Sequence, residues 1–497
     1  MTITVRAATA PSARAIFLLM AQGADLKQHP WFKRLPAAVQ QTALALVRAR
    51  EFTGKTDEVR VIPFGSAART LVLLGLGERK NFTHRQAMLV ARKIIVVAKQ
   101  HKLLDVALTF ADVQVSGWSA EQLGQLLAEN FQLAHYDYTR YRTVPKGGWP
   151  QVKNVQMLCS ANALRDVQRG VRAGTIIGQA TNAARDLGNT PGSDMTPTLL
   201  ANAAVTAGKR MGFTVTILKK DALEKIGMGG VLGVARGSEH PPTFSILEYA
   251  APGHEKDTPI VYIGKGVTFD SGGLNVKPDT GMYEMHMDMS GGAAVISALS
   301  AIALLQLPVR VIGLIPAVEN MAAGDAYRPG DQLRSLSGKT IEVMHTDAEG
   351  RVILADALTY AERFKPSAVI DVATLTGAAI GALGQRASAL LSPDENFSRE
   401  LQELSEQSGD FGWPLPLWPE YEADVQGTFG DVANSAKTRW GGAITAAAFL
   451  WQFAKKHKRW AHMDIAPTMT TIDGQHLAKG SAGAGVRLLV AYARAHA

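Results

Sequence analysis

The stretch SGGAAVISALSAIALLQLPVRVIGLIPAV, residues 290–318, joins two patterns that together indicate an α/β fold. Its first half, residues 290–305, is a run of small and apolar residues that suits a helix, and its second half contains the almost uninterrupted apolar run VRVIGLIPAV. A strand without alternating polar residues is typical of a sheet that is buried on both faces. The stretch therefore predicts a mainly parallel or mixed sheet with helices on both faces.

Further strands of the same kind lie on both sides of this stretch. The segments TVTIL, TFSILEYA, PIVYIG, AVIDVATL and HMDIAP are apolar and are separated by helical patterns. We assign residues 191–497 to one α/β domain, which we expect to be the catalytic domain. In such sheets the ligand site usually lies at the carboxyl ends of the strands.

The first third of the chain repeats this alternation and predicts a second α/β domain over residues 1–160. Strands are predicted at VRVIPF, TLVLLGLG and DVALTF, and helices at 83–100 and near 119–134. A long helical pattern at 166–189, ended by TPGSDMTP, indicates a connecting helix within residues 161–190. A chain of 497 residues is too long for one ordinary core, which agrees with two domains.

The segment RAIFLLMAQGA, residues 14–24, has two interpretations. Arginines before a short apolar run can mark a secretory signal, but this run covers only Ala15 to Ala21 and Asp25 follows closely. We interpret it as a buried strand. Because the chain has a single cysteine, Cys159, and no unbroken run of about 18 apolar residues, we predict a reducing, cytoplasmic location and no transmembrane helix.

Charge is distributed unevenly between the two predicted domains. Residues 1–160 contain 21 Lys and Arg against 10 Asp and Glu, a net charge of +11, whereas residues 161–497 carry −3. The basic first domain has two interpretations: a solvated surface, or a surface for DNA or another anionic partner. We find no recognised nucleic-acid motif in this part of the sequence.

Charged residues gather where two of the predicted strands end. In IGKGVTFDSGGLNVKP, residues 263–278, a strand ends at Lys265, and a glycine-rich loop is expected to carry Asp270 and Lys277. In MHMDMSGGAAV, Asp288 directly precedes the small-residue helix. Taken one at a time, such residues are more often loop charges or helix caps than functional groups.

A third segment, HTDAEGRVILADAL, residues 345–358, runs from a strand into a helical pattern. Asp347, Glu349 and Arg351 occupy alternate positions, and on an extended chain they would project from one face. This segment could form a salt-bridged loop or part of a metal site.

Considered together, the three segments satisfy a charge count. Their four acidic residues would balance two divalent cations, and a neutral Lys265 would add a nitrogen ligand. Lys277 and Arg351 would remain as cations that can meet a developing oxyanion. Oxygen ligands with one amine and no sulfur suit zinc, manganese, cobalt or magnesium. Two such ions can activate water against a carbonyl or a phosphoester.

The ordered combination of NTPGSDMTP, GKGVTFDSGGLNVKP, MHMDMSGGAAV, HTDAEGRVILADAL, DVATLTGA and KGSAGAGVRLL resembles the leucyl aminopeptidase family of dinuclear metallo-exopeptidases. The TDAEGR stretch serves as the signature of that family. The resemblance covers residues 180–490, and residues 1–160 match the variable amino-terminal domain of the family only in general layout.

The resemblance implies a role for each charged residue. Lys277 would contact the substrate carbonyl or the tetrahedral intermediate, and Arg351 would hold a bicarbonate ion that acts as general base toward a metal-bridging water. Zinc or manganese is favoured, with cobalt or magnesium as alternatives. The tighter metal ion would be bound by Lys265, Asp270, Asp288 and Glu349, and the other by Asp270, Asp347 and Glu349 together with the Asp347 carbonyl.

One position departs from the family pattern. The family usually has asparagine where this chain has His345, and that position lines the pocket for the amino-terminal side chain. By the same residue-by-residue comparison, Met285, Thr374 and Gly377 would line this pocket too. His345 therefore puts the usual leucine preference in doubt. A metal-ligand role for His345 or His286 is the less favoured alternative.

From the residues and the resemblance we predict a metal-dependent aminopeptidase that acts on short peptides in the cytoplasm. The resemblance implies a homohexamer whose active sites face an interior cavity. Two alternatives stay open. The basic domain, residues 1–160, could have an additional or separate DNA-binding or architectural role, and the same two-metal site could hydrolyse phosphoesters.

Overall fold

The computed structural model describes residues 1–7, 10–65 and 69–497, and the chain divides into two compact units. Unit 1 comprises Met1–Gln179 and Asp473–Ala478, and unit 2 comprises Ala180–Ile472 and Lys479–Ala497. The division falls within the long helix α4 (Leu164–Gly188), in the segment where a connecting helix was predicted.

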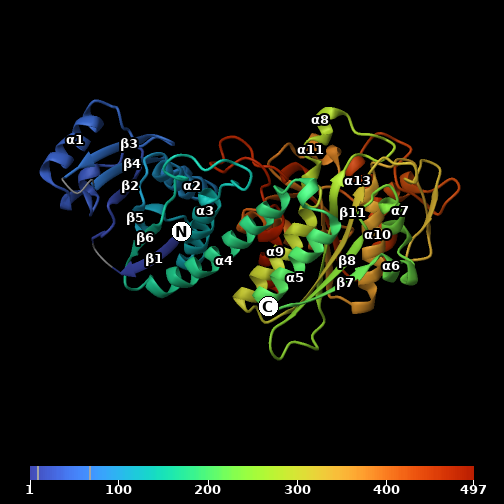
Figure 1. Cartoon of the computed structure of the whole chain (residues 1–497). Helices are drawn as coiled ribbons and strands as arrows, with labels where there is room; N and C mark the ends of the chain where they lie inside the picture. Colours follow the sequence, from blue (N-terminus) through green and yellow to red (C-terminus); the bar gives the residue numbers. More distant parts are fainter. Residues whose placement is uncertain (8–9, 66–68) are drawn as a thin grey trace. The chain divides into compact units, whose positions relative to one another are not determined.

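Unit 1 is built on a six-stranded sheet in the order β1-β6-β5-β2-β4-β3. All neighbouring strands are parallel except β3 and β4, which are antiparallel. Helices α2 (His84–Gln100) and α3 (Ala120–His135) pack against each other, and α1 (Ala37–Arg48) lies near β3 (Figure 1). The predicted strands and helices of this region are confirmed. The strands are β1 (Thr2–Ala7), β2 (Ala15–Ala21), β3 (Val59–Phe64), β4 (Arg69–Gly77), β5 (Asp105–Thr109) and β6 (Asn154–Cys159).

Strand β2 is the run that could imitate a secretory signal. It lies between β4 and β5 in the sheet, and each residue from Ala15 to Met20 is at most 6% exposed. The interpretation of this run as a buried strand is confirmed.

Unit 2 contains a nine-stranded sheet in the order β16-β15-β18-β14-β9-β11-β8-β7, with β10 paired to β11 beside this path. The central strands β18, β14, β9 and β11 are parallel, whereas β8 runs antiparallel to both of its neighbours and β15 runs antiparallel to β18. The sheet is therefore mixed, as predicted. The strands are β7 (Thr214–Lys219), β8 (Thr243–Ala250), β9 (Ile260–Gly264), β10 (Gly266–Asp270), β11 (Arg310–Asn320), β14 (Ala368–Ala373), β15 (Ser388–Leu391), β16 (Gly412–Pro414) and β18 (Trp460–Asp464).

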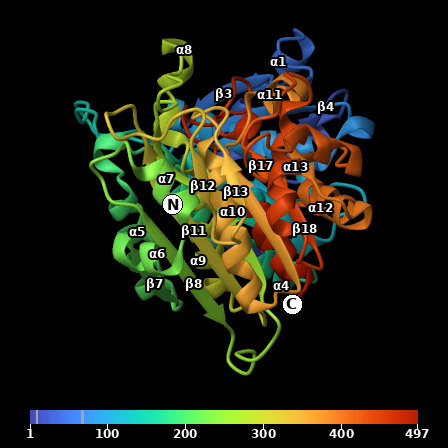
Figure 2. The same cartoon turned by 90° about the vertical axis from the view of Figure 1, so that its right-hand side faces the viewer.

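Helices cover both faces of this sheet, as the predicted fold class requires. Figure 1 shows α5 and α9 on one side of β11 and β8, and α7 and α10 on the other. Figure 2 looks onto the face that α7, α10 and α13 cover. The first face carries α5 (Pro197–Met211), α9 (Ser290–Leu305) and α14 (Val486–Ala495), and the second carries α7 (Gly229–Ala235), α10 (Glu349–Ala361) and α13 (Gly442–Ala454).

The start of α9 lies unusually close to the sheet because glycines stand at the contact. A Cβ at Gly291 would lie 2.0 Å from the carbonyl oxygen of Val372, and one at Gly264 would lie 2.4 Å from the Gly291 oxygen. The Gly292 amide also donates a hydrogen bond of 2.8 Å to the Lys265 carbonyl. This approach brings the residues just before α9 to the carboxyl ends of β9 and β14.

One stretch, Asp279–Leu305, is long and apolar enough to cross a membrane by length and composition. It contains α9, and 89% of its most apolar window is buried inside the protein. Such burial is typical of a core helix. Polar residues within the stretch explain why a search for one unbroken apolar run does not find it.

Candidate metal centre

The charged residues of the three sequence segments come together in unit 2 at the carboxyl ends of β9, β10 and β14. Lys265 connects β9 to β10, and Asp270 is the last residue of β10. Asp288 follows a short 3-10 turn, Met285–Met287, and precedes α9. This edge is where the fold class places a ligand site.

One local prediction about this edge was wrong. The glycine-rich loop was expected to begin after Lys265, but Gly266–Asp270 forms β10, which pairs in parallel with β11. The register shifts between Val267 and Phe269, so this strand is irregular. The loop begins only at Ser271, and Asp270 is therefore held by a strand.

The prediction that Asp347, Glu349 and Arg351 project from one face of an extended chain was also wrong. Helix α10 begins at Glu349, with Ala348 as its amino-terminal cap. Residues two apart in a helix are rotated by about 200°, so Glu349 and Arg351 point in different directions. The turn before α10 still brings the acids together. Carboxylate oxygens of Asp270, Asp347 and Glu349 lie within 4.8 Å of one another.

Lys265 is enclosed by two of the acids. Its Nζ lies 2.8 Å from Asp288 Oδ1 and 2.9 Å from Glu349 Oε1, and it donates a hydrogen bond of 2.9 Å to the Thr374 carbonyl. Burial alone would lower the pKa of Lys265, but the neighbouring carboxylates raise it above its ordinary value. A Cβ at Gly350 would lie 2.7 Å from this Nζ, so the glycine of TDAEGR makes room for the lysine.

Lys277 bridges the other two acids. Its Nζ lies 2.9 Å from Asp270 Oδ2 and 2.5 Å from Asp347 Oδ1. Burial again opposes its charge, and the carboxylates raise the pKa of Lys277 above its ordinary value. Burial also raises the pKa of Asp270, Asp288 and Asp347, because it disfavours their charged forms.

Two carboxylate oxygens of this cluster lack a hydrogen-bond donor in the part of the chain that the structure describes. Asp288 Oδ2 and Glu349 Oε2 are buried and have no hydrogen-bond partner among the described residues. A buried carboxylate oxygen without a donor is costly, and a cation supplies what it lacks. Four acids with two lysines and no sulfur fit hard or borderline divalent metal ions. Neither His286 nor His345 belongs to the group of close ligand atoms found among the described residues.

A frame of uncharged residues holds the acids in place, and the sequence analysis did not identify it. Asn320, the last residue of β11, donates hydrogen bonds of 2.8 Å to Asp270 Oδ1 and 3.0 Å to the Thr346 carbonyl. The Thr346 hydroxyl donates to the Gly272 carbonyl at 2.6 Å, and its amide donates to Asn275 Oδ1 at 2.8 Å. These bonds tie the loop after β10 to the turn before α10. The position of Asn320 at the carboxyl end of a buried strand was the available signal.

Arg351 lies close to the acids without pairing with them. Its Nη1 donates to the Asn434 carbonyl at 3.0 Å, and its buried Nε has no partner among the described residues. Burial lowers the pKa of Arg351 to about 10, although Glu349, Asp464 and Asp347 act in the opposite direction. The guanidinium therefore keeps hydrogen-bond donors for an anion.

The four predicted pocket residues differ in exposure. Thr374 is buried, and its hydroxyl donates to Asp288 Oδ1 at 2.6 Å. Met285 is half-buried at the start of its 3-10 turn, whereas Gly377 is exposed at the start of α11 (Gly377–Leu383). His345 is exposed, and its Nδ1 accepts a hydrogen bond of 3.2 Å from the Asp347 amide.

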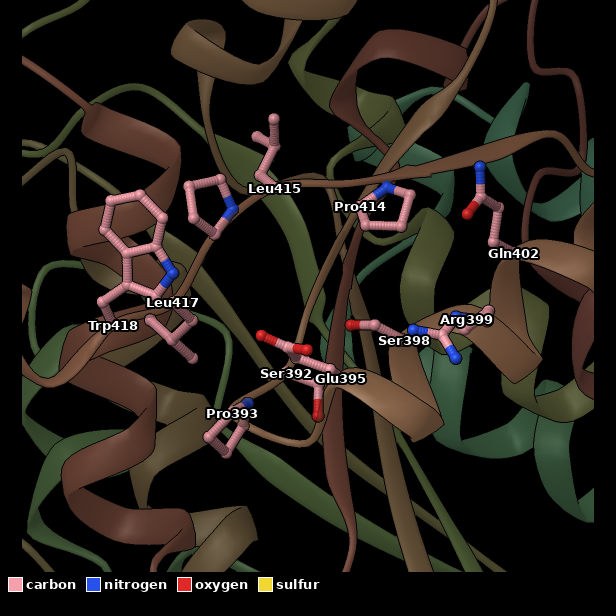
Figure 3. A pocket seen from close by; sticks show the side chains of 11 residues that line it. Ser392, Pro393, Glu395, Ser398, Arg399, Gln402, Pro414, Leu415, Leu417 and Trp418 are labelled. Atoms are coloured by element: carbon pink, nitrogen blue, oxygen red, sulfur yellow. The ribbon is translucent and has the colours of Figure 1, made fainter.

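A separate pocket of about 330 Å³ lies beside α12 (Glu395–Ser408), and Figure 3 shows it from close by. Side chains of α12 such as Glu395 and Arg399 line one part, and Leu415 and Trp418 line another. None of its lining residues belongs to the acid cluster. It is therefore not part of the candidate metal centre.

Comparisons with known proteins cover both parts of the chain. The model for the catalytic domain of the cytosol aminopeptidase family matches residues 182–490, and the model for the N-terminal domain of that family matches residues 16–145. A probable cytosol aminopeptidase of Azoarcus sp. (strain BH72) is 39% identical over 510 residues, covering 99% of this chain and 98% of the relative. One of Azotobacter vinelandii is 38% identical over 496 residues, covering 99% of each.

Two solved structures of a bottromycin maturation enzyme have the same fold as this chain. The bottromycin maturation enzyme BotP in complex with Mn aligns with a TM-score of 0.85 and 32% sequence identity, covering 98% of this chain and 100% of that one. A second structure of BotP aligns with a TM-score of 0.84 at the same identity.

Proposed function

The chain belongs to the cytosol aminopeptidase family and is a metal-dependent aminopeptidase, and we propose that the acid cluster of unit 2 is its dinuclear metal centre. The observation that carries this assignment is the convergence of Asp270, Asp347 and Glu349 within 4.8 Å, next to buried carboxylate oxygens that lack partners among the described residues. A cation between these oxygens would satisfy them and offset the mutual repulsion of the acids.

We assign each ligand to one of two metal ions. Lys265 can serve as a ligand only as a neutral amine, and its place between Asp288 and Glu349 suits that role once a metal ion replaces the ammonium proton. Zinc or manganese is the first choice and cobalt or magnesium the alternative; the BotP structure contains Mn. Lys265, Asp270, Asp288 and Glu349 would hold one ion, and Asp270, Glu349 and Asp347 with its carbonyl would hold the other.

The bound metals would supply a Lewis acid that lowers the pKa of water and polarises the scissile carbonyl. Lys277, whose ammonium lies against Asp270 and Asp347, would donate a hydrogen bond to the oxyanion as the carbonyl carbon becomes tetrahedral. Arg351 would hold a bicarbonate ion through the donors that it does not use on Asn434. A bicarbonate ion held there would supply a general base near the scissile bond.

The substrate is a short peptide whose amino-terminal side chain would contact Met285, His345, Thr374 and Gly377. Because Nδ1 of His345 accepts the Asp347 amide, Nε2 carries the ring proton and can donate to a substrate. This donor favours amino-terminal residues with an acceptor in the side chain over leucine. Assaying aminoacyl-anilides that carry leucine, methionine, serine, asparagine or glutamine measures this preference.

The basic character of residues 1–160, with a net charge of +11, supports a second role in binding DNA. A gel-shift assay should then show affinity that falls steeply with salt, and binding without a salt dependence would argue against phosphate contacts. We further propose a homohexamer with its active sites facing an interior cavity, and a cytoplasmic location. Sedimentation of the purified chain tests the oligomer.

The main test reloads metal-free protein with Zn²⁺, Mn²⁺ or Co²⁺ and assays aminoacyl-anilides beside phosphate esters. We expect metal-dependent hydrolysis of the anilides. The variant Glu349→Gln should lose at least about a thousandfold in kcat, because it removes a ligand shared by both ions. Asp356→Asn, a nearby change outside the cluster, should keep the metal content. Full activity of Glu349→Gln, or activity on phosphate esters alone, would overturn the assignment.

A further inference from the structure

Asn434 lies where a small sheet meets the turn before α10. The sheet contains β13 (Thr340–Glu342) and β17 (Val432–Ala433), which are parallel and side by side (Figure 2). Asn434 directly follows β17, is 0% exposed, and donates its amide to the Glu342 carbonyl at 2.9 Å. The ladder between the two strands ends at Glu342, four residues before Thr346.

The side-chain amide of Asn434 continues this ladder where the strands stop. Its Oδ1 accepts hydrogen bonds from the Met344 amide at 2.7 Å and the His345 amide at 3.2 Å. Its Nδ2 donates to the His345 carbonyl at 2.8 Å. An asparagine side chain is an amide, with a donor and an acceptor arranged as in a peptide group. It therefore bonds the main chain of Met344 and His345 in the way that a neighbouring strand would.

The main chain of the same residue fixes Arg351. The Asn434 carbonyl accepts the Arg351 Nη1 bond of 3.0 Å, which orients the guanidinium while leaving its Nε unpartnered among the described residues. One buried residue therefore contacts both His345 and Arg351. It is 89 positions from the first and 83 from the second along the chain.

We propose that Asn434 is a positioning residue that fixes His345 and Arg351 relative to the acids at Asp347 and Glu349. The roles of His345 in the substrate pocket and of Arg351 in anion binding rest on the proposed function. The positioning itself rests on the four hydrogen bonds. Asn434 makes no contact with the side chains of the proposed metal ligands in these bonds, so its loss should leave the metals bound.

Substitutions that remove different bonds give a graded test. Asn434→Ala removes all three side-chain hydrogen bonds. Asn434→Asp can still accept the hydrogen bonds from the Met344 and His345 amides, but it cannot donate one to the His345 carbonyl. In the metal-loaded full chain we expect hydrogen exchange at Met344 and His345 to speed up at least tenfold in the alanine variant and less in the aspartate variant. Metal content should stay at the wild-type level in both.

Kinetics separate positioning from a general loss of stability. The alanine variant should lose about 10- to 100-fold in kcat/KM, and its preference among amino-terminal side chains should flatten because the main chain of His345 is no longer fixed. The matched control is Asn130→Ala in α3. This asparagine is also buried and accepts from Arg92 Nε at 2.7 Å, so its loss should lower stability without changing substrate preference.

A double variant with Arg351→Ala distinguishes this inference from the proposed function. If Asn434 acts partly through Arg351, the two losses in kcat should combine to less than their product. Unchanged hydrogen exchange at residues 344–345, or an unchanged substrate preference in a folded Asn434→Ala, would overturn the inference. Full activity of Arg351→Ala alone would instead overturn the role given to Arg351 and leave the exchange measurement valid. Should the alanine variant fail to fold, Asn434→Asp carries both measurements.

Discussion

The two α/β units present the same kind of sheet edge and carry different chemistry on it. In unit 1 the carboxyl ends of neighbouring strands β2 and β5 lead to His29 and Asp112, which bond to each other at 3.1 Å. Asp112 also accepts the Leu19 amide at 3.4 Å. In unit 2 the corresponding edge gathers four carboxylates and two lysines, and two buried carboxylate oxygens lack partners among the described residues.

The difference shows that the fold provides the edge and that the residues following the strands decide its use. In unit 1 the histidine and the aspartate satisfy each other, so the edge needs no further ligand. In unit 2 the acids outnumber the lysines, and burial raises the pKa of Asp270, Asp288 and Asp347. That is the electrostatic condition that divalent cations relieve.

The largest stability effect is expected from Asp356, a buried carboxyl of α10 that accepts the Val231 amide at 2.9 Å and the Leu336 amide at 2.7 Å. Burial raises its pKa from 3.8 to about 7, although these amides act to lower it. The folded state therefore holds this proton more tightly than the unfolded chain. The stabilisation of the folded state by this protonated carboxyl is complete below pH 4. About 4 kcal/mol of it is lost as the pH rises to 7.

Urea unfolding of unit 2 at several pH values measures this contribution. The variant Asp356→Asn should remove the part of the pH dependence that belongs to this carboxyl, so that its stability profile between pH 4 and 7 is flatter than that of the wild type. Asp221→Asn, at an exposed position of α6 (Lys220–Ile226), serves as the control and should leave the profile unchanged. Parallel profiles for wild type and Asp356→Asn would contradict the assignment.

A smaller effect is expected from Asp112→Ala, which tests whether the sheet edge of unit 1 serves stability and not catalysis. The substitution leaves Nε2 of the buried His29 without its partner, while Nδ1 still accepts from the Trp31 amide, and it should cost about 1–3 kcal/mol. Peptide hydrolysis should stay within twofold of wild type, since this edge holds no metal in our assignment. The surface pair His254–Asp257 at 2.7 Å provides the matched control, and Asp257→Ala should cost less than about 1 kcal/mol. A folded Asp112→Ala variant without activity would contradict the conclusion that the two sheet edges have different roles.

The smallest effect is expected from His135 in α3, because solvent screens the interactions of this half-buried ring, and its sign is opposite to that of Asp356. Burial lowers the pKa of His135 to about 4, helped by the terminal amine and Lys99 and opposed by Asp137. Its Nε2 accepts the Val152 amide at 3.3 Å, which requires the neutral ring. The unfolded chain therefore binds the proton more tightly, and unit 1 should lose stability as the pH falls from 6.5 to 4.

Hydrogen exchange in unit 1 reports this acid-induced loss. His135→Gln retains an acceptor without a titrating ring, so exchange at Val152, corrected for intrinsic rates, should become independent of pH over this range. His101→Gln, at the exposed end of α2, is the control and should behave like wild type. An acid-induced loss that persists in His135→Gln would show that other groups cause it.

Much of the fold could be predicted because its strands are apolar runs and its helices have a matching periodicity. The buried strand β2 was predicted from the short length of its apolar run, and the core helix α9 from its small and apolar residues. The candidate site was harder to predict than the fold. Residue types near strand ends, together with the family resemblance, identified the charged side chains, but the local conformation at β10 and at the start of α10 was mispredicted. An alternating pattern of charges does not reveal where a helix begins.

By itself the sequence determined the α/β class, the edge that carries the charges and the identity of the candidate ligands, since these depend on local composition and on motifs. Only the tertiary structure decided that Lys265 and Lys277 each bridge a pair of acids, that Asn320 and Thr346 form the frame, and that Asn434 contacts both His345 and Arg351. Those contacts join residues between 7 and 89 positions apart. The periodicity of a segment records which side of it is buried, and it carries no information on which distant segment lies there.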